Sequence, residues 1–291
     1  MPIYSESNPA DLRVPARETF ASRAKKALGP IAAVGILIAK FFAKVKFILL
    51  PLLKFLPILL KSGGTMIFSI WIYAMLFGWQ FAVGFVLLLF VHECGHLIVG
   101  KKFGLKVSAP VFIPFMGAFI LLKDAPRNAW MEACVGIGGP MLGTVGAIAC
   151  NLLGNYLDSP LLIAVASFGY FLNLFNLVPV GFLDGGRIVT AISRWLWLPG
   201  FVVLLWFGWR YPNFIVWLMI ILSFKRVYSL FRKPTEEERR YFETTPAQRW
   251  SMSFLYFGLI AILALGMHLA HNELADRGFV PHTHNRQPVV Q

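Results

Sequence analysis

The sequence is poor in charged residues. Only 14% of its 291 residues are charged, whereas a soluble domain carries roughly 25%. Hydrophobic residues make up 57% of the chain, and apolar stretches of about 20 residues, long enough to cross a bilayer, recur along it. These properties exclude an ordinary soluble domain and predict an all-α, multi-pass integral membrane protein.

Cysteine is also scarce. The three cysteines are odd in number, widely spaced and set in apolar segments, which argues against a disulfide framework. A cleavable signal peptide is not expected either. The first apolar run begins near Leu28, behind a long polar stretch, and no small-residue cleavage site follows it.

The net charge of +13 admits nucleic acid as a partner, but in a membrane protein it is more typical of loops that face the cytoplasm and anionic lipid. With a cytoplasmic amino terminus and alternating spans, 24 of the 27 Lys and Arg residues fall on the cytoplasmic side. We therefore expect anionic lipid contact at that face, no nucleic acid partner, and residence in a bacterial inner membrane or a plasma membrane.

The chain is predicted to divide into six regions. They are a disordered basic cytoplasmic N-terminus (1–26), an amphipathic interfacial segment (27–64), a transmembrane core (65–224), a charged cytoplasmic loop (225–250), a last transmembrane helix (251–270) and a polar tail (271–291). Lysines interrupt each apolar run between residues 27 and 61, and two prolines would kink a helix there. A pair of short irregular spans is the alternative for this segment.

The predicted spans are separated by one segment of different character. Apolar runs at 65–77, 80–100, 129–154, 160–180 and 251–270 are expected to be spanning helices, and 196–224, broken at "GWRYPN", a re-entrant hairpin. The segment "VSAPVFIPFMGAFILL" is rich in β-branched and aromatic residues and is interrupted by Pro and Gly. It predicts short strands or a hairpin.

Ionisable residues interrupt one of these apolar runs. The segment "LLLFVHECGHLIVG" contains H-E-x-x-H, with His92 and His96 four residues apart and therefore on one face of a helix. Two imidazoles at this spacing can share a zinc ion, and Glu93 can take a proton from the attacking water. Intramembrane ionisable residues are expensive and usually functional, so we interpret this motif as a metal site.

A catalytic zinc usually has a third protein ligand and an open position. Asp184 is the only acidic residue between Asp158 and Glu236. It lies three residues before Arg187, and His92 lies about 13 Å before the helix end at Lys101. Both therefore belong to the cytoplasmic half, and we predict Asp184 as the third ligand.

Two motifs together resemble the site-2 protease family of intramembrane zinc metalloproteases (peptidase M50-like). HECGH is followed by N-x-x-P-x-x-x-x-D-G from Asn176 through Asp184, and "GIGGPMLGTVGA" is similar to the Gly-Pro stretch of the family. The family often carries an asparagine three residues after that proline, where this chain has Gly143 and Thr144. The resemblance implies a transmembrane core of about six spans with a small re-entrant β-hairpin on the cytoplasmic side.

The resemblance also implies a role for each motif residue. His92, His96 and Asp184 are expected to bind one catalytic Zn²⁺, Glu93 to act as general base and proton shuttle, and Asn176 to hold substrate or the oxyanion. From the residues alone, an interhelical hydrogen bond is an equal alternative for Asn176, and Asn173 is expected to be structural.

The predicted function is hydrolysis of a peptide bond within or near a transmembrane segment of a membrane protein or peptide substrate. Such cleavage serves regulated intramembrane proteolysis or clearance of membrane remnants. The alternative is a non-catalytic membrane metal-binding protein or a metal-ion transporter. A transporter should show ligands stacked along a pathway or paired broken helices, whereas the candidate ligands here share one depth.

Overall fold

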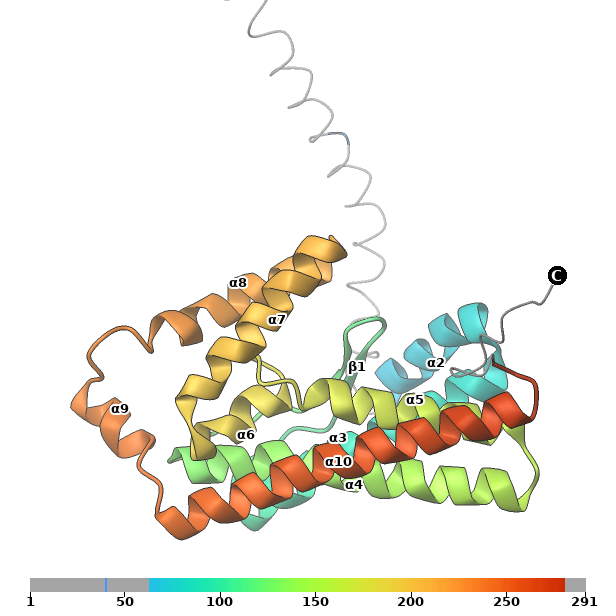
Figure 1. Cartoon of the computed structure of the whole chain (residues 1–291), viewed down its shortest axis with the longest axis horizontal. Coiled ribbons are helices and arrows are strands. Elements are labelled where there is room, and N and C mark those ends of the chain that lie inside the picture. The colour runs from blue at the N-terminus through green and yellow to red at the C-terminus, as the bar shows by residue number, and fades with distance from the viewer. Residues whose placement is uncertain (1–39, 41–62, 281–291) are drawn as a thin grey trace, which may run out of the picture. The chain divides into compact units, whose positions relative to one another are not determined.

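The computed structural model describes Lys40 and residues 63–280 (Figure 1). Residues 1–26, almost all of the predicted interfacial segment and the end of the predicted tail lie outside this part. The described part is helical apart from one hairpin. In chain order its elements are α2 (Gly64–Phe77), α3 (Trp79–Lys102), β1 (Val111–Ile113), β2 (Gly117–Phe119), α4 (Ala129–Tyr156), α5 (Pro160–Asn176), α6 (Asp184–Ile192), the 3-10 helix η2 (Arg194–Leu196), α7 (Trp197–Arg210), α8 (Phe214–Tyr228), α9 (Glu236–Tyr241) and α10 (Pro246–Asp276).

Polar N-caps explain where four of these helices begin. In each case a side-chain oxygen accepts a backbone N–H of the first turn, which otherwise lacks a partner. The caps are Asn128 for α4, Ser159 for α5, Thr235 for α9 and Thr245 for α10. The last two form capping boxes with Glu238 and Gln248, respectively.

Two of these caps lie within the predicted charged loop, where the structure places helices. Residues 225–250 include the end of α8 and the whole of α9, and the last helix begins at Pro246 rather than at 251. Hydropathy does not indicate this start, because the first turn of the helix contains polar and charged residues. The Thr-x-x-Gln capping box marks it instead.

Helix α4 lies at the centre of the described part. It packs against α3, α5, α6 and α10, and α10 runs along α4 and α5 (Figure 1). The main hydrophobic core lies among these helices and includes Ile163, Leu177, Ile188 and Leu263, each at most 2% exposed. Tyr256 of α10 donates its hydroxyl to the carbonyl of Leu177 at 2.6 Å, which holds the chain that leads into α6.

A two-stranded antiparallel hairpin follows α3, as the sequence predicted. The register pairs Phe112 with Ala118. The Phe112 N–H does not point to β2 but donates to the Thr65 hydroxyl of α2 at 3.3 Å, and the Phe115 N–H donates to the Tyr73 hydroxyl at 2.9 Å. Helix α2 therefore holds one edge of the hairpin.

Three described helices are long and apolar enough to cross a membrane: α3, α4 and α10. Helices α2 and α5 are apolar but shorter, with lengths of about 21 and 26 Å at 1.5 Å per residue. The stretch predicted as a re-entrant hairpin forms α7 and α8, which are interrupted at residues 211–213 inside the "GWRYPN" segment. The total of about six spans and the cytoplasmic side of the hairpin remain predictions.

Candidate metal centre

The two histidines of HECGH lie on one buried face of α3. His92 is 2% exposed and His96 is 4% exposed, and their Nε2 atoms are 3.1 Å apart. One turn of helix brings the two rings together. The structure therefore places both nitrogens where a single ion can reach them.

Asp184, the first residue of α6, completes this group. Its Oδ2 lies 3.2 Å from Nε2 of His92 and 3.2 Å from Nε2 of His96. Three ligands held tetrahedrally at zinc distances lie about 3.3 Å from one another. The nearly equilateral triangle observed here therefore has the size that a zinc ion requires, and it leaves a fourth position for water or substrate.

The hydrogen bonds of the outer ring nitrogens determine which nitrogens carry protons. Nδ1 of His92 lies 2.8 Å from Oδ1 of Asn173, and Nδ1 of His96 lies 2.8 Å from the carbonyl oxygen of Val135. Because both partners are acceptors, each Nδ1 donates, and in the neutral rings both Nε2 lone pairs face each other and a carboxylate. Buried lone pairs repel in this arrangement, whereas a shared cation makes it favourable.

Glu93 provides a carboxylate beside this group. It follows His92 on α3, is 4% exposed, and its Oε2 has no hydrogen-bond partner among the described residues. A buried carboxylate oxygen left unpaired is costly and usually marks a group that serves water, an ion or chemistry.

Helix α4 approaches the site closely because it is rich in glycine. A Cβ on Gly139 would lie 2.2 Å from Nε2 of His96, and one on Gly143 would lie 2.2 Å from Oδ1 of Asn173. No side chain fits at either position. Gly143, which lies three residues after Pro140, thus makes room for an amide that comes from α5.

That amide belongs to Asn173, whose role sequence reasoning missed. Asn173 is 1% exposed. Its Nδ2 donates to the carbonyl of Gly169 at 2.7 Å, which turns Oδ1 toward His92. The sequence feature that could have indicated this role is a polar residue within an apolar helix, since such residues usually hydrogen-bond to another helix.

Asn176, the predicted substrate or oxyanion residue, is only half-buried. Its amide donates to the carbonyl of Leu172 at 3.2 Å, one turn back in its own helix. Its role in binding therefore stays a prediction.

A second polar network holds α6 from its outer side. The carbonyl of Gly186 accepts hydrogen bonds from Nε1 of Trp197 at 2.9 Å and from Arg226 at 3.1 Å. Arg226 also pairs with Glu132 at 3.2 Å, and the Tyr241 hydroxyl donates to the other Glu132 oxygen at 2.9 Å. Glu132 is therefore engaged by α8 and α9.

Comparison with known proteins matches the part of the chain that contains HECGH. The family model "Peptidase family M50" matches residues 80–159, a stretch that contains HECGH and the glycine-rich part of α4. A zinc metalloprotease of Methanocaldococcus jannaschii is 33% identical over 119 residues, which are 38% of this chain and 34% of that protein. Rip3 of Mycobacterium tuberculosis, named as a candidate zinc metalloprotease, is 32% identical over 38% of this chain and 29% of its own length.

Over residues 80–159 the chain is similar to peptidase family M50. This stretch includes HECGH and belongs to a chain whose described part has three helices apolar enough to cross a membrane. A longer match is the chloroplast protein EGY2 of Oryza sativa subsp. indica, also named as a candidate zinc metalloprotease, at 23% identity over 239 residues. This match covers 64% of this chain but 42% of the relative. The chain thus spans less than half the length of each of these relatives.

Proposed function

We propose that this chain is a site-2 protease-like zinc metalloendopeptidase that hydrolyses a peptide bond within or near a transmembrane segment of another membrane protein. The observation that carries the proposal is the convergence of two buried Nε2 atoms and one carboxylate oxygen within 3.2 Å, with an unpaired glutamate next to them. This combination meets the needs of metal-assisted hydrolysis.

His92, His96 and Asp184 would hold the zinc ion. When bound, zinc polarises a carbonyl and makes water nucleophilic near neutral pH. Glu93 accepts a proton from the attacking water and passes it to the leaving amine nitrogen. Asn173 and the Val135 carbonyl keep the ligand nitrogens unprotonated and correctly turned.

The substrate must be unwound before it reacts, because a helix engages its own carbonyls. We propose that the outer edge of β2 binds the unwound segment by strand addition. The Phe112 N–H points away from β2, so Phe112 and Ala118 form a non-hydrogen-bonded pair. The polar backbone groups of Ala118 therefore point outward, and no described residue bonds to them.

An Ala118→Pro variant tests this edge. It removes one outward N–H without altering the metal ligands, so we expect cleavage to fall at least about tenfold while bound zinc stays at one per chain. The measurement pairs a cleavage assay in vesicles with zinc analysis. Unchanged cleavage would show that the substrate binds elsewhere.

A Glu93→Gln variant tests the protease itself. Glutamine keeps the shape but cannot act as a base, so cleavage of a transmembrane model substrate should fall about 10²–10⁴-fold. Zinc content by mass spectrometry should stay at wild-type level, whereas His92→Ala and Asp184→Ala should lose zinc. Near-normal cleavage by Glu93→Gln would refute the mechanism and favour the alternative of a non-hydrolytic metal protein.

A further inference from the structure

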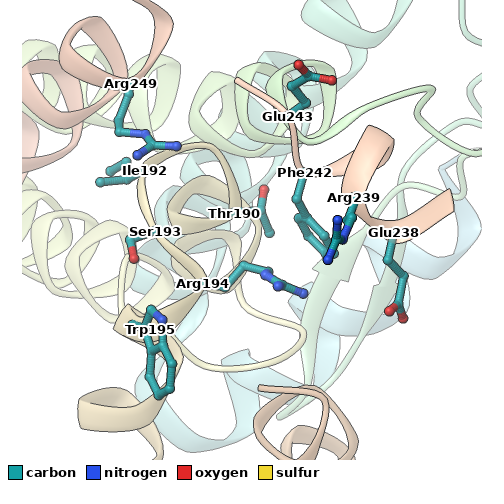
Figure 2. A pocket seen from close by; sticks show the side chains of 10 residues that line it. All are labelled: Thr190, Ile192, Ser193, Arg194, Trp195, Glu238, Arg239, Phe242, Glu243 and Arg249. Carbon is teal, nitrogen blue, oxygen red and sulfur yellow. The ribbon is translucent and has the colours of Figure 1, made fainter. Parts of the chain in front are cut away.

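A cavity of about 350 Å³ lies where the end of α6 and η2 meet the segment that joins α9 to α10 (Figure 2). Its walls include Thr190 and Ile192 of α6, Arg194 and Trp195 of η2, and Phe242 after α9. Its volume falls within the roughly 300–1,000 Å³ of small-molecule sites. The cavity lies at the opposite end of α6 from Asp184 and is therefore not part of the metal site.

Three arginines line this cavity without carboxylate partners. In Figure 2 the guanidinium groups of Arg194 and Arg239 point toward each other across the cavity, and Arg249 stands at its rim. Among the described residues, none of the three forms an ion pair. The Arg194 guanidinium lies 4.5 Å from the Phe242 ring centroid. Like charges that share a cavity repel each other, and a bound anion relieves this repulsion.

The two carboxylates at the cavity do not supply that anion. In Figure 2 the carboxylates of Glu238 and Glu243 point away from the arginine pair. Glu238 is already paired with Arg232, and it accepts a hydrogen bond from the Thr235 N–H at 3.1 Å. The middle of the cavity therefore remains positive.

The cavity also lies at the end of a membrane-crossing helix. Arg249 belongs to the first turn of α10, and the next residue, Trp250, is 77% exposed. Trp195 in the cavity wall is 59% exposed. Tryptophan beside arginine at a helix end is typical of the headgroup level of a bilayer, where lipid phosphates lie.

We propose that this cavity binds a phosphate group, held by the guanidinium forks of Arg194 and Arg239 with Arg249 at the entrance. Arginine suits phosphate because its planar fork donates two parallel charge-assisted hydrogen bonds. The phosphate belongs either to the headgroup of an anionic lipid or to a free phosphate compound. The site is independent of the proposed protease activity.

The test is native mass spectrometry of the full-length protein in neutral detergent, titrated with phosphatidylglycerol or phosphatidylcholine. A parallel arm measures thermal melting with glycerol 3-phosphate and with inorganic phosphate. The variant Arg194→Gln/Arg239→Gln should bind phosphate ligands at least about tenfold more weakly. The matched control for the Arg239 change is Arg240→Gln, which also removes one charge from α9 but lies outside the cavity and pairs with Glu236 at 3.7 Å.

Selective loss of phosphatidylglycerol binding by the double variant supports the lipid source. If the soluble phosphates raise the melting temperature of the wild type but not of the double variant, the ligand is a free phosphate compound. Equal binding by wild type and variant in both arms, or an equal loss in Arg240→Gln, overturns the proposal. Should the double variant fail to fold, Arg239→Gln alone, at an exposed position, carries the same comparison.

Discussion

At the scale of single residues, Asn173 fixes the orientation of His92 in the proposed metal site. Its amide accepts from Nδ1 of His92 and is itself fixed by the carbonyl of Gly169. Outer partners of metal-ligating histidines set the tautomer and the ring orientation, and their loss typically costs about 10–100-fold in metal affinity or activity. Asn173 is therefore a positioning residue.

An Asn173→Ala variant should bind zinc about 10–100-fold more weakly than wild type, because His92 loses the acceptor that fixes its tautomer. Competition with a chromogenic chelator measures this affinity without reference to cleavage. Asn173→Asp is a partial control, since it keeps an oxygen acceptor for His92 but cannot donate to Gly169, and its zinc affinity should lie above that of Asn173→Ala. Equal zinc affinity in Asn173→Ala and wild type would show that the hydrogen bond does not position His92.

At the scale of elements, side chains of α8 and α9 bind α4 and also α6, the helix that carries Asp184. Arg226 of α8 links Glu132 of α4 to the carbonyl of Gly186 in α6, and Tyr241 of α9 binds the same glutamate. Burial raises the pKa of Tyr241, and the Glu132 carboxylate raises it further. The hydroxyl is therefore a protonated donor at neutral pH and ties α9 to α4, which Arg226 in turn links to α6 and thus to the helix of Asp184.

A Tyr241→Phe variant should lower the free energy of unfolding by about 1–3 kcal/mol, because one oxygen of the largely buried Glu132 carboxylate loses its donor. Thermal melting in detergent measures the change. Tyr228→Phe is the matched control, since Tyr228 is 61% exposed and should have little effect on melting. If both variants melt alike, the Tyr241 hydroxyl does not stabilise the fold.

The sequence predicts the elements better than it predicts their contacts. Apolar runs indicated α2, α3, α4 and α5, and Pro and Gly among β-branched residues indicated the hairpin, because these signals are local. The helical spacing of His92 and His96 is a local signal as well. The hydrogen bond from His92 to Asn173 has no local signal, since it joins residues 81 positions apart and depends on how closely α5 can approach α4.

At the scale of the whole molecule, the metal site joins parts of the chain that are distant in sequence. His92 and His96 come from α3, Asp184 comes from α6, and α4 packs against both helices. Because its ligands come from α3 and α6, a bound ion would act as a cross-link between these two helices.

The composition indicates a membrane protein, but it does not determine the number of spans, because α2 and α5 are shorter than the roughly 30 Å hydrocarbon core.

Removal of zinc should destabilise the folded protein, because the two Nε2 lone pairs and the Asp184 carboxylate then face one another without a cation. A ligand present at about 1,000 times its Kd stabilises the native state by about 4.1 kcal/mol, and 1 kcal/mol shifts Tm by about 2–4 °C in a protein of about 150–250 residues. A chelator should therefore lower Tm by on the order of 10 °C, and added zinc should restore it. His96→Ala should melt early and respond to neither reagent, whereas Glu93→Gln should respond as wild type does. Identical melting of the zinc-loaded and the chelated wild-type protein would show that the ion does not join α3 to α6.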